Sequence, residues 1–401
     1  MQVTLIGLGG AGETITLAAR EALERADVIV GAARLIESIP KTDRQKYFTE
    51  YRTEAIIEIL ARESAARSCV VFSGDSGFFS GARSLLPQLR QRGIDCRVLP
   101  GVSSVQLLAA RLGRPWQDWT LVSAHGAACD PVTAILRGKP AFFLTGGDNT
   151  PAALCRALAD AGLGDVRVTV GENLAAAEER IVEATVAEAA EQAFAPLSVL
   201  LVEAVERPDV PVGGVADDMF LRGSVPMTKQ EVRAAILSKL ALRRTDTVWD
   251  VGAGTGSVSV ELALAANEGR VCAVECADEA CELIEANRRR FGAWNLRLAR
   301  GTAPEALAGL PAPDAVFIGG SKGRLREIME AALAANPAAR LCVSAIAMET
   351  LSTALDACKA LQLDMDIAQI SVSRTRAAGA LHLLTANNPV FLITAKRGGD
   401  A

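Results

Sequence analysis

Short apolar runs that end in glycine, serine or acidic residues recur along the whole chain. They include residues 3–6, 69–72, 141–144, 248–251 and 315–318. Each run has the length of a buried strand, and segments of helical length separate the runs. This alternation predicts an α/β protein with doubly wound parallel sheets, in which the loops at the carboxyl ends of the strands share one edge and form ligand sites.

The clearest single pattern is the strand at 248–251, which carries Asp250 and leads into a loop with three glycines. Glycine lets a ligand approach the main chain closely, and the helix after the loop offers free N–H groups and a positive dipole end. Glu275 ends the next strand, where a carboxylate can accept hydrogen bonds from a ribose diol. This order, Asp-x-Gly-x-Gly-x-Gly and then an acid, resembles the class I S-adenosylmethionine methyltransferases.

A dinucleotide-binding fold is the alternative, because it also combines a glycine loop with an acid. Its loop, however, reads Gly-x-Gly-x-x-Gly and lacks the leading aspartate. Gly7, Gly9 and Gly12 satisfy that second pattern near the N-terminus. The strand after them has no acid at its end, since Asp27 precedes it, so we favour methyl-donor binding over a nicotinamide cofactor.

Length and composition limit the classes of protein. The 401 residues suggest two or three domains, and a hydrophobic fraction of 50% suffices for ordinary globular cores. A net charge of −5 argues against an extended nucleic-acid surface. Because we find no apolar run of membrane-spanning length and no signal peptide, we expect a cytoplasmic protein without a membrane partner. We also expect a homo-oligomer.

The cysteines and histidines do not suggest a metal site. Nine cysteines are scattered without a Cys-x-x-Cys pair, and the nearest group is Cys272, Cys276 and Cys281. The two histidines, His125 and His382, are far from that group. Buried free thiols are therefore favoured over zinc, and we expect no metal.

Four further strands of the N-terminal half lead into short polar loops, at residues 73–81, 100–104, 123–126 and 145–149. With the first glycine loop, and in this order, they resemble the tetrapyrrole methylase family, in particular its precorrin C5 methylase branch. The match covers about residues 1–205. It departs from the family where Gly10 and Ser76 replace the usual prolines.

This resemblance implies a bilobal α/β fold, divided near residue 115, with S-adenosylmethionine held between the lobes. His125 is favoured as a hydrogen-bonded structural group over a catalytic base. The residues that the resemblance places beside the donor are Gly9, Gly74, Asp75, Ser103, Ser104 and Thr145.

Prolines and glycines without periodicity predict a linker at residues 206–217. Residues 218–401 then form a predicted class I, Rossmann-like methyltransferase domain. Its segments 223–228, 250–256 and 301–307, together with 318–321, resemble the precorrin-6B decarboxylating methylase family over about residues 218–397.

By this second resemblance another S-adenosylmethionine lies against the C-terminal glycine loop. Thr228 and Glu231 also have the spacing of a capping box, so Thr228 is equally expected to begin a helix. The residues that the resemblance places beside the donor are Thr228, Gly252, Ala253, Gly254, Thr255, Gly256, Glu275 and Ala303. Because the implied substrate carries many carboxylates, we expect cationic side chains in the wall of its pocket. The candidates are Arg222, Lys229, Lys322, Arg324, Arg374 and Arg376.

Together the resemblances imply a bifunctional enzyme of cobalamin biosynthesis that uses two S-adenosylmethionine sites. It would methylate precorrin-6B at carbons 5 and 15 and remove the carboxylate of the carbon-12 acetate, giving precorrin-8. The reduced macrocycle is electron-rich at its bridging carbons, so the protein has mainly to align carbon with methyl and exclude water. The alternatives are a class I methyltransferase of RNA or another small molecule with an unrelated N-terminal half, and a donor-sensing regulatory module.

Overall fold

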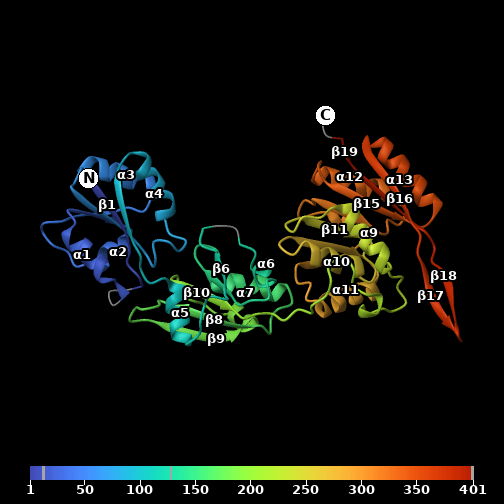
Figure 1. Ribbon diagram of the computed structural model, residues 1–401, viewed down its shortest axis with the longest axis horizontal. Helices are drawn as coiled ribbons and strands as arrows, with labels where there is room; N and C mark the ends of the chain where they lie inside the picture. Colours follow the sequence, from blue (N-terminus) through green and yellow to red (C-terminus); the bar gives the residue numbers. More distant parts are fainter. Residues whose placement is uncertain (11–13, 127–128, 399–401) are drawn as a thin grey trace. The chain divides into compact units, whose positions relative to one another are not determined.

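The computed structural model describes residues 1–10, 14–126 and 129–398, and the chain divides into two compact units (Figure 1). The first unit comprises Met1–Pro131 and Lys139–Ala204, and the second comprises Val132–Gly138 and Val205–Ala401. Gly12 of the first glycine loop lies outside the described residues. Each unit has its own sheets and hydrophobic clusters, so each is described by itself.

The first lobe of the N-terminal unit is a parallel sheet with the order β3-β2-β4-β1-β5. Side chains alternate along its central strand, so that Ile6 packs towards α1 while Leu5 packs towards α3 and α4. Helices therefore cover both faces, as a parallel sheet requires. The elements are β1 (Gln2–Gly7), α1 (Leu17–Arg25), β2 (Val28–Gly31), α2 (Ala33–Ser38), β3 (Lys46–Thr49), α3 (Thr53–Glu63), β4 (Arg67–Phe72), α4 (Ala82–Gln91) and β5 (Asp95–Leu99).

The second lobe of this unit is a mixed sheet with the order β6-β7-β10-β8-β9, in which β10 runs antiparallel to β7 and β8. Its core contains Phe142, which is fully buried and stacks on Trp119 with ring centroids 6.3 Å apart. The elements are α5 (Ser104–Leu112), β6 (Thr120–Ser123), β7 (Ala141–Leu144), α7 (Pro151–Asp160), β8 (Arg167–Glu172), β9 (Arg180–Thr185), α8 (Val186–Ala190) and β10 (Ser198–Val202).

The second unit is built on one larger sheet with the order β13-β12-β11-β14-β15-β19-β16. Its strands are parallel except that β19 pairs antiparallel with β15 and β16. Val248 packs with the cluster of α9 and α10, whereas its neighbour Trp249 packs with that of α12 and α13. Period-two alternation thus buries both faces of the sheet.

Helices and strands alternate along most of the second unit, and three consecutive strands follow. The elements are α6 (Pro131–Ile135), η2 (Asp217–Met219), α9 (Gln230–Leu240), β11 (Thr247–Val251), α10 (Ser257–Ala265), β12 (Arg270–Glu275), α11 (Asp278–Arg290), β13 (Leu296–Arg300), η3 (Glu305–Leu307), β14 (Ala315–Ile318), α12 (Leu325–Ala335), β15 (Arg340–Ala345), α13 (Met348–Ala360), β16 (Leu363–Ile370), β17 (Ser373–Ala378), β18 (Leu381–Ala386) and β19 (Val390–Arg397). The mixed α/β architecture confirms the predicted fold class.

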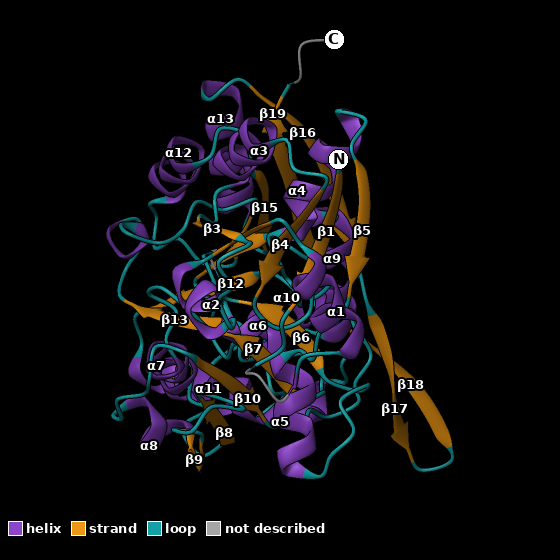
Figure 2. Ribbon diagram, turned by 90° about the vertical axis from the view of Figure 1, so that its left-hand side faces the viewer, coloured by secondary structure: helices purple, strands orange, loops and turns teal. Residues whose placement is uncertain are grey.

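The strands β17 and β18 pair only with each other among the described strands. They form a hairpin that projects from the rest of the C-terminal unit (Figure 2). None of the helices in the described part of the chain combines the length and apolar character needed to cross a bilayer.

The burial of Phe142 gives a stability prediction for the first unit. Phe142→Ala should cost about 3–5 kcal/mol, because it leaves a cavity between Trp119 and Phe78. Calorimetric unfolding of the full chain should show the transition of the first unit at a lower temperature and that of the second unit unchanged. Leu17→Ala is the control, since Leu17 is 76% exposed. Equal losses from both variants would contradict the assignment of this core.

Candidate active sites

The first candidate site is a cavity of about 480 Å³ in the N-terminal unit. Its volume lies in the range of small-molecule pockets. The loops after β1, β4 and β7 and the start of α5 form its wall, with further residues from β10 of the second lobe. The lining includes all six residues that the sequence places beside a donor in this half: Gly9, Gly74, Asp75, Ser103, Ser104 and Thr145.

Direct backbone contact holds the loops of this cavity together. Gly9 and Gly74 exchange two N–H···O bonds of 3.0 Å. A Cβ atom on Gly101 would lie 2.3 Å from the Gly74 carbonyl oxygen, so a residue with a side chain cannot replace Gly101 without moving the loops. Asp75 accepts from the backbone N–H of Gly101 at 3.0 Å and of Gly77 at 2.8 Å. Its carboxylate therefore fixes the loops that form the site.

Other predicted donor residues also carry structural hydrogen bonds. Ser103 caps α5, forming a capping box with Gln106. The Thr145 hydroxyl donates to the carbonyl oxygen of Ser198 at 2.6 Å. His125 lines the cavity with Nδ1 3.3 Å from the Thr145 carbonyl oxygen. These polar groups of the wall are therefore already hydrogen-bonded within the protein.

Sequence reasoning missed the aromatic residues of this cavity. Tyr51 and Phe79 line it although 78% and 47% of their surfaces are exposed. Phe79 has a φ of +48°, which is rare for a bulky residue and marks a position held by its surroundings. The successive phenylalanines in the polar 73–81 loop were the available signal, because exposed aromatic residues in a loop suggest binding.

The second candidate site lies at the carboxyl ends of β11, β12 and β14 in the C-terminal unit. Gly252, Gly254 and Gly256 have φ values of +72°, +57° and +74°, which strain any residue with a side chain. A Cβ atom on Gly252 would also lie 2.7 Å from the backbone nitrogen of Gly320. The loop therefore packs directly on the loop after β14.

A cavity of about 160 Å³ adjoins this loop. Of the predicted donor residues, Gly252, Glu275 and Ala303 line it. Thr228 lies on a separate segment before α9. The other predicted residues continue the glycine loop into α10: Ala253, Gly254, Thr255 and Gly256.

Glu275 organises this site through the main chain. Its carboxylate accepts from the backbone N–H of Gly254 at 3.0 Å, Cys276 at 2.7 Å and Ala277 at 3.0 Å. Burial acts to raise the pKa of Glu275, but these backbone hydrogen bonds together lower it below its ordinary value. The group is therefore an ionised acceptor facing the cavity.

Asp250 lies fully buried beneath the glycine loop. Ser259 donates its hydroxyl to Oδ2, while Oδ1 has no hydrogen-bond partner among the described residues. Burial raises the pKa of Asp250 to about 7. The hydroxyl of Thr255 is also buried without a partner in the described part of the chain. Unpartnered buried polar atoms at one loop are typical of a ligand site.

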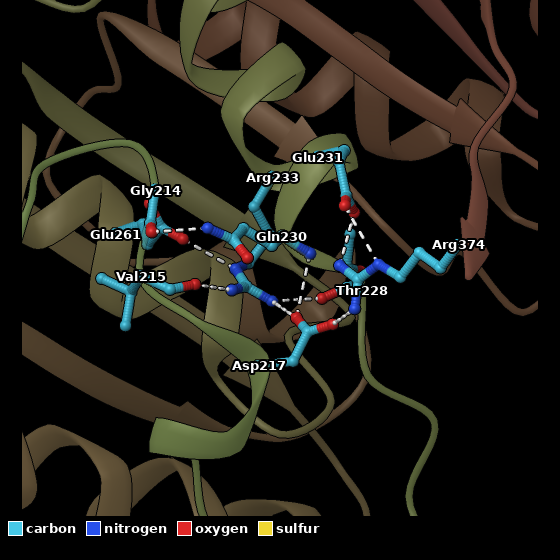
Figure 3. A network of polar contacts seen from close by, with 9 residues as sticks. All are labelled: Gly214, Val215, Asp217, Thr228, Gln230, Glu231, Arg233, Glu261 and Arg374. Carbon is cyan, nitrogen blue, oxygen red and sulfur yellow. Dashed lines mark hydrogen bonds and ion pairs between the residues drawn. The ribbon is translucent and has the colours of Figure 1, made fainter. Parts of the chain in front are cut away.

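The segment before α9, residues 213–229, is held by the buried guanidinium of Arg233 (Figure 3). Arg233 is 0% exposed and donates to Glu261 at 2.7 Å and Asp217 at 2.8 Å. It also donates to the backbone carbonyls of Val215 and Thr228. We call residues 213–229 the strap, because these bonds fasten it to α9 and α10.

Asn287 fastens the same strap to the glycine loop. Its side chain exchanges hydrogen bonds with the backbone of Leu221 and donates to the carbonyl oxygen of Thr255 at 2.9 Å. Pro226 of the strap lies near Gly254, with its carbonyl oxygen 3.5 Å from the position of a Cβ atom. The strap thus covers the loop that carries the predicted donor residues.

The predicted capping box is wrong. The helix α9 begins at Gln230 after Lys229, and no side chain of the N-cap residue caps it. The carboxylate of Asp217 accepts from the Gln230 N–H at 2.9 Å instead, and Glu231 is bound by Arg374 at 2.6 Å. Tertiary partners have replaced the local cap that the spacing suggested.

The comparisons with known proteins follow this division of the chain. Residues 2–190 match the tetrapyrrole (corrin/porphyrin) methylase family and residues 218–397 match the precorrin methyltransferase domain. A curated relative from a Sinorhizobium species, a precorrin-6Y C(5,15)-methyltransferase (decarboxylating), is 33% identical over 400 residues, covering 98% of this chain and 95% of the relative. The chain belongs to this family.

Two further relatives each match somewhat less than half of the chain. A probable cobalt-precorrin-6B C(15)-methyltransferase (decarboxylating) from Pyrobaculum calidifontis is 45% identical over 185 residues, which cover 45% of this chain and 95% of that protein. A solved precorrin-6Y C5,15-methyltransferase structure from Geobacter metallireducens is 36% identical, covers 47% of this chain and all of that chain, and has a TM-score of 0.46. The family matches confirm both resemblances, and the N-terminal half is not unrelated to the corrin pathway.

The candidate cations differ in their availability in this member of the precorrin-6Y C(5,15)-methyltransferase family. Arg374 pairs with Asp217 and Glu231, and Arg324 pairs with Glu305 and Glu327. Lys322 lines the C-terminal cavity, where its Nζ lies 2.9 Å from the sulfur of Cys276. The candidates without an ion pair among the described residues are Arg222, Lys229, Lys322 and Arg376, and of these Lys322 contacts the Cys276 sulfur.

The raised pKa of Asp250 predicts a dependence of stability on pH. The folded state keeps a proton up to about pH 7, whereas the unfolded chain loses it near the ordinary aspartate pKa of 3.8. Stability should therefore fall as the pH rises from about 4 to 7, by at most about 1.4 kcal/mol per pH unit from this group. Asp250→Asn should lose that component when unfolding free energies are compared across this range. Asp218→Asn, at an exposed residue, should keep the wild-type profile; parallel profiles for wild type and Asp250→Asn would contradict the prediction.

Proposed function

We propose that this chain methylates precorrin-6B at carbons 5 and 15 and removes the carboxyl group of the carbon-12 acetate, with one donor site in each unit. The observation that carries the proposal is family membership across 98% of the chain, together with a separate glycine-loop cavity in each unit. Methyltransferases of these families use S-adenosylmethionine, which supplies an electrophilic methyl group.

The cavity of the N-terminal unit suits the donor together with a flat macrocycle. We assign donor contacts to the glycine-rich loops around Gly9 and Gly74 and to the start of α5. Tyr51 and Phe79 expose aromatic surface on which a conjugated ring can pack. Arg34, which also lines the cavity, offers a guanidinium to a substrate carboxylate. This division of roles rests on the chemistry of the lining.

The C-terminal cavity suits the same donor in another way. Ionised Glu275 can accept from a ribose diol, and the unpaired Oδ1 of Asp250 lies under the glycine loop, which ends at the N-terminus of α10. We assign further donor contacts to Thr228, Ala303 and the loop 252–256. We assign the substrate carboxylates to the candidate cations that have no side-chain partner among the described residues. These cations are Arg222, Lys229 and Arg376.

The protein's contribution to the reaction is alignment and exclusion of water. Each rigid loop set holds one donor while the cavity wall holds the ring carbon that attacks the methyl group. Loss of the acetate carboxylate is favoured where cations orient the group and water is excluded. We assign that step to the C-terminal unit, because residues 218–397 match the precorrin methyltransferase domain and a relative named as a decarboxylating C(15)-methyltransferase matches only 45% of this chain.

The two-site proposal predicts the stoichiometry of donor binding. Calorimetric titration of the full chain with S-adenosylhomocysteine should give two sites, and Gly254→Val should leave one, because its side chain would stand where the donor approaches the main chain. Gly309→Val is the matched control. Gly309 has a φ of +80° with open space around it and does not line the C-terminal cavity. Two sites in Gly254→Val, or one site in Gly309→Val, would contradict the assignment.

The assignment of decarboxylation predicts which variant loses it. Gly254→Val in the full chain should abolish methylation at carbon 15 and the release of carbon dioxide from precorrin-6B. Gly74→Val, which alters the N-terminal cavity, should abolish methylation at carbon 5 and retain carboxyl loss. Mass spectrometry of the products separates a gain of methyl from a loss of carboxyl. Carboxyl loss that disappears in Gly74→Val and persists in Gly254→Val would reverse the assignment.

A further inference from the structure

A cysteine and a lysine meet at the wall of the C-terminal cavity and have no role in the proposed methyl transfer. Cys276 follows Glu275 at the end of β12, and Lys322 lies on the loop after β14. The Lys322 Nζ lies 2.9 Å from the Cys276 sulfur, and both residues line the cavity. Cys276 is half-buried and Lys322 is exposed, so small reagents can reach the pair.

The backbone on both sides fixes this contact. Cys276 donates its N–H to Glu275 at 2.7 Å, which holds the cysteine at the strand end. Lys322 has a φ of +47° and precedes Gly323 with a φ of +83°, so the loop turns sharply at the lysine. The hydrogen bond to the Cys276 sulfur raises the pKa of Lys322, and the amine therefore remains a cation at neutral pH.

The geometry places the ammonium of Lys322 directly against the Cys276 sulfur. The thiolate is the form of cysteine that attacks electrophiles, and a neighbouring cation stabilises it. The Cys276 thiol also donates to Oε1 of Glu275 at 3.5 Å, a longer contact than the 2.9 Å between the sulfur and the Nζ of Lys322. In contrast, burial raises the pKa of the thiols of Cys272 and Cys342. These thiols stay protonated and inert.

We propose that Cys276 is a thiol-modification site at which low-molecular-weight disulfides close the C-terminal donor cavity, with the Lys322 ammonium placed beside the attacking sulfur. The Cys276 thiolate attacks one sulfur of the disulfide, a new S–S bond forms, the old one breaks, and the second half leaves as a thiolate. An added thiol reverses the exchange. The assignment of this cavity to the donor rests on the proposed function.

Closure follows from the position of the sulfur. The cavity has only about 160 Å³, and Cys276 borders Glu275, the proposed acceptor for the ribose. A glutathionyl group on this sulfur would fill the space that the donor needs. The N-terminal donor site would stay open, so oxidation would block the reactions of the C-terminal unit alone.

The test uses the full chain with oxidised glutathione as the probe. Peptide mass mapping should find the mixed disulfide on Cys276 first, and S-adenosylhomocysteine present beforehand should suppress it. Titration of the modified protein should give one donor site in place of two, and dithiothreitol should restore the second. Cys276→Ser treated in the same way should keep the same number of sites as before treatment.

Two variants of Lys322 distinguish activation of the Cys276 sulfur by the lysine from simple access of the reagent to that sulfur. Lys322→Met should slow modification of Cys276 by roughly tenfold or more, because the cation beside the sulfur is lost. Lys322→Arg keeps the charge and should retain most of the rate. Cys96, half-buried in the other unit, is the internal control, and its rate should not change in either variant.

The outcomes separate this inference from the proposed function. Two outcomes would overturn the inference alone, provided that untreated protein has two donor sites. In one, Cys276 reacts with oxidised glutathione no faster than Cys96; in the other, modified protein still binds donor at both sites. A faster reaction in Lys322→Met would overturn the role of the lysine. Untreated protein that binds no donor in the C-terminal unit would overturn the proposed function and the inference together.

Discussion

Close backbone contact between loops that follow parallel strands is the constraint on which both units depend. In the first unit the loops after β1, β4 and β5 meet at Gly9, Gly74 and Gly101, where a Cβ atom on Gly101 would lie 2.3 Å from a carbonyl oxygen. In the second unit Gly252 meets Gly320 in the same way. Glycine is therefore required at these contacts, and each cavity opens beside them.

The two cavities differ although the same constraint builds them. The N-terminal cavity is large and largely apolar, with exposed aromatic residues, and its polar side chains are occupied by the loops themselves. The C-terminal cavity is small and bordered by Glu275, Cys276 and Lys322. The proposal of one donor for both cavities does not require the same pocket twice, because different folds can supply different groups to one ligand.

Buried charge holds the strap over the C-terminal glycine loop. The guanidinium of Arg233 is balanced by Glu261 and Asp217 and packs on Phe220, with the cation 4.7 Å from the ring centroid. Asp217 also binds Arg374 of the β17–β18 hairpin. A buried charge without partners is costly, so this network permits few other positions of the strap. Strap, hairpin and α9 are thus linked through one carboxylate.

The sequence alone determined the fold class, the families of both halves and the glycine loops that border the two candidate cavities. Strand length, glycine spacing and the acid at Glu275 are local features, and they are readable because backbone geometry demands those residues at those places. Tertiary structure decided the rest. Thr228 and Glu231 have the spacing of a capping box, yet the Asp217 carboxylate accepts from the Gln230 N–H at the start of α9 and Arg374 binds the Glu231 carboxylate. The same holds for Lys322, whose contact with Cys276 joins residues 46 positions apart. Long side chains choose partners by distance in the fold, and spacing along the chain carries no record of that choice.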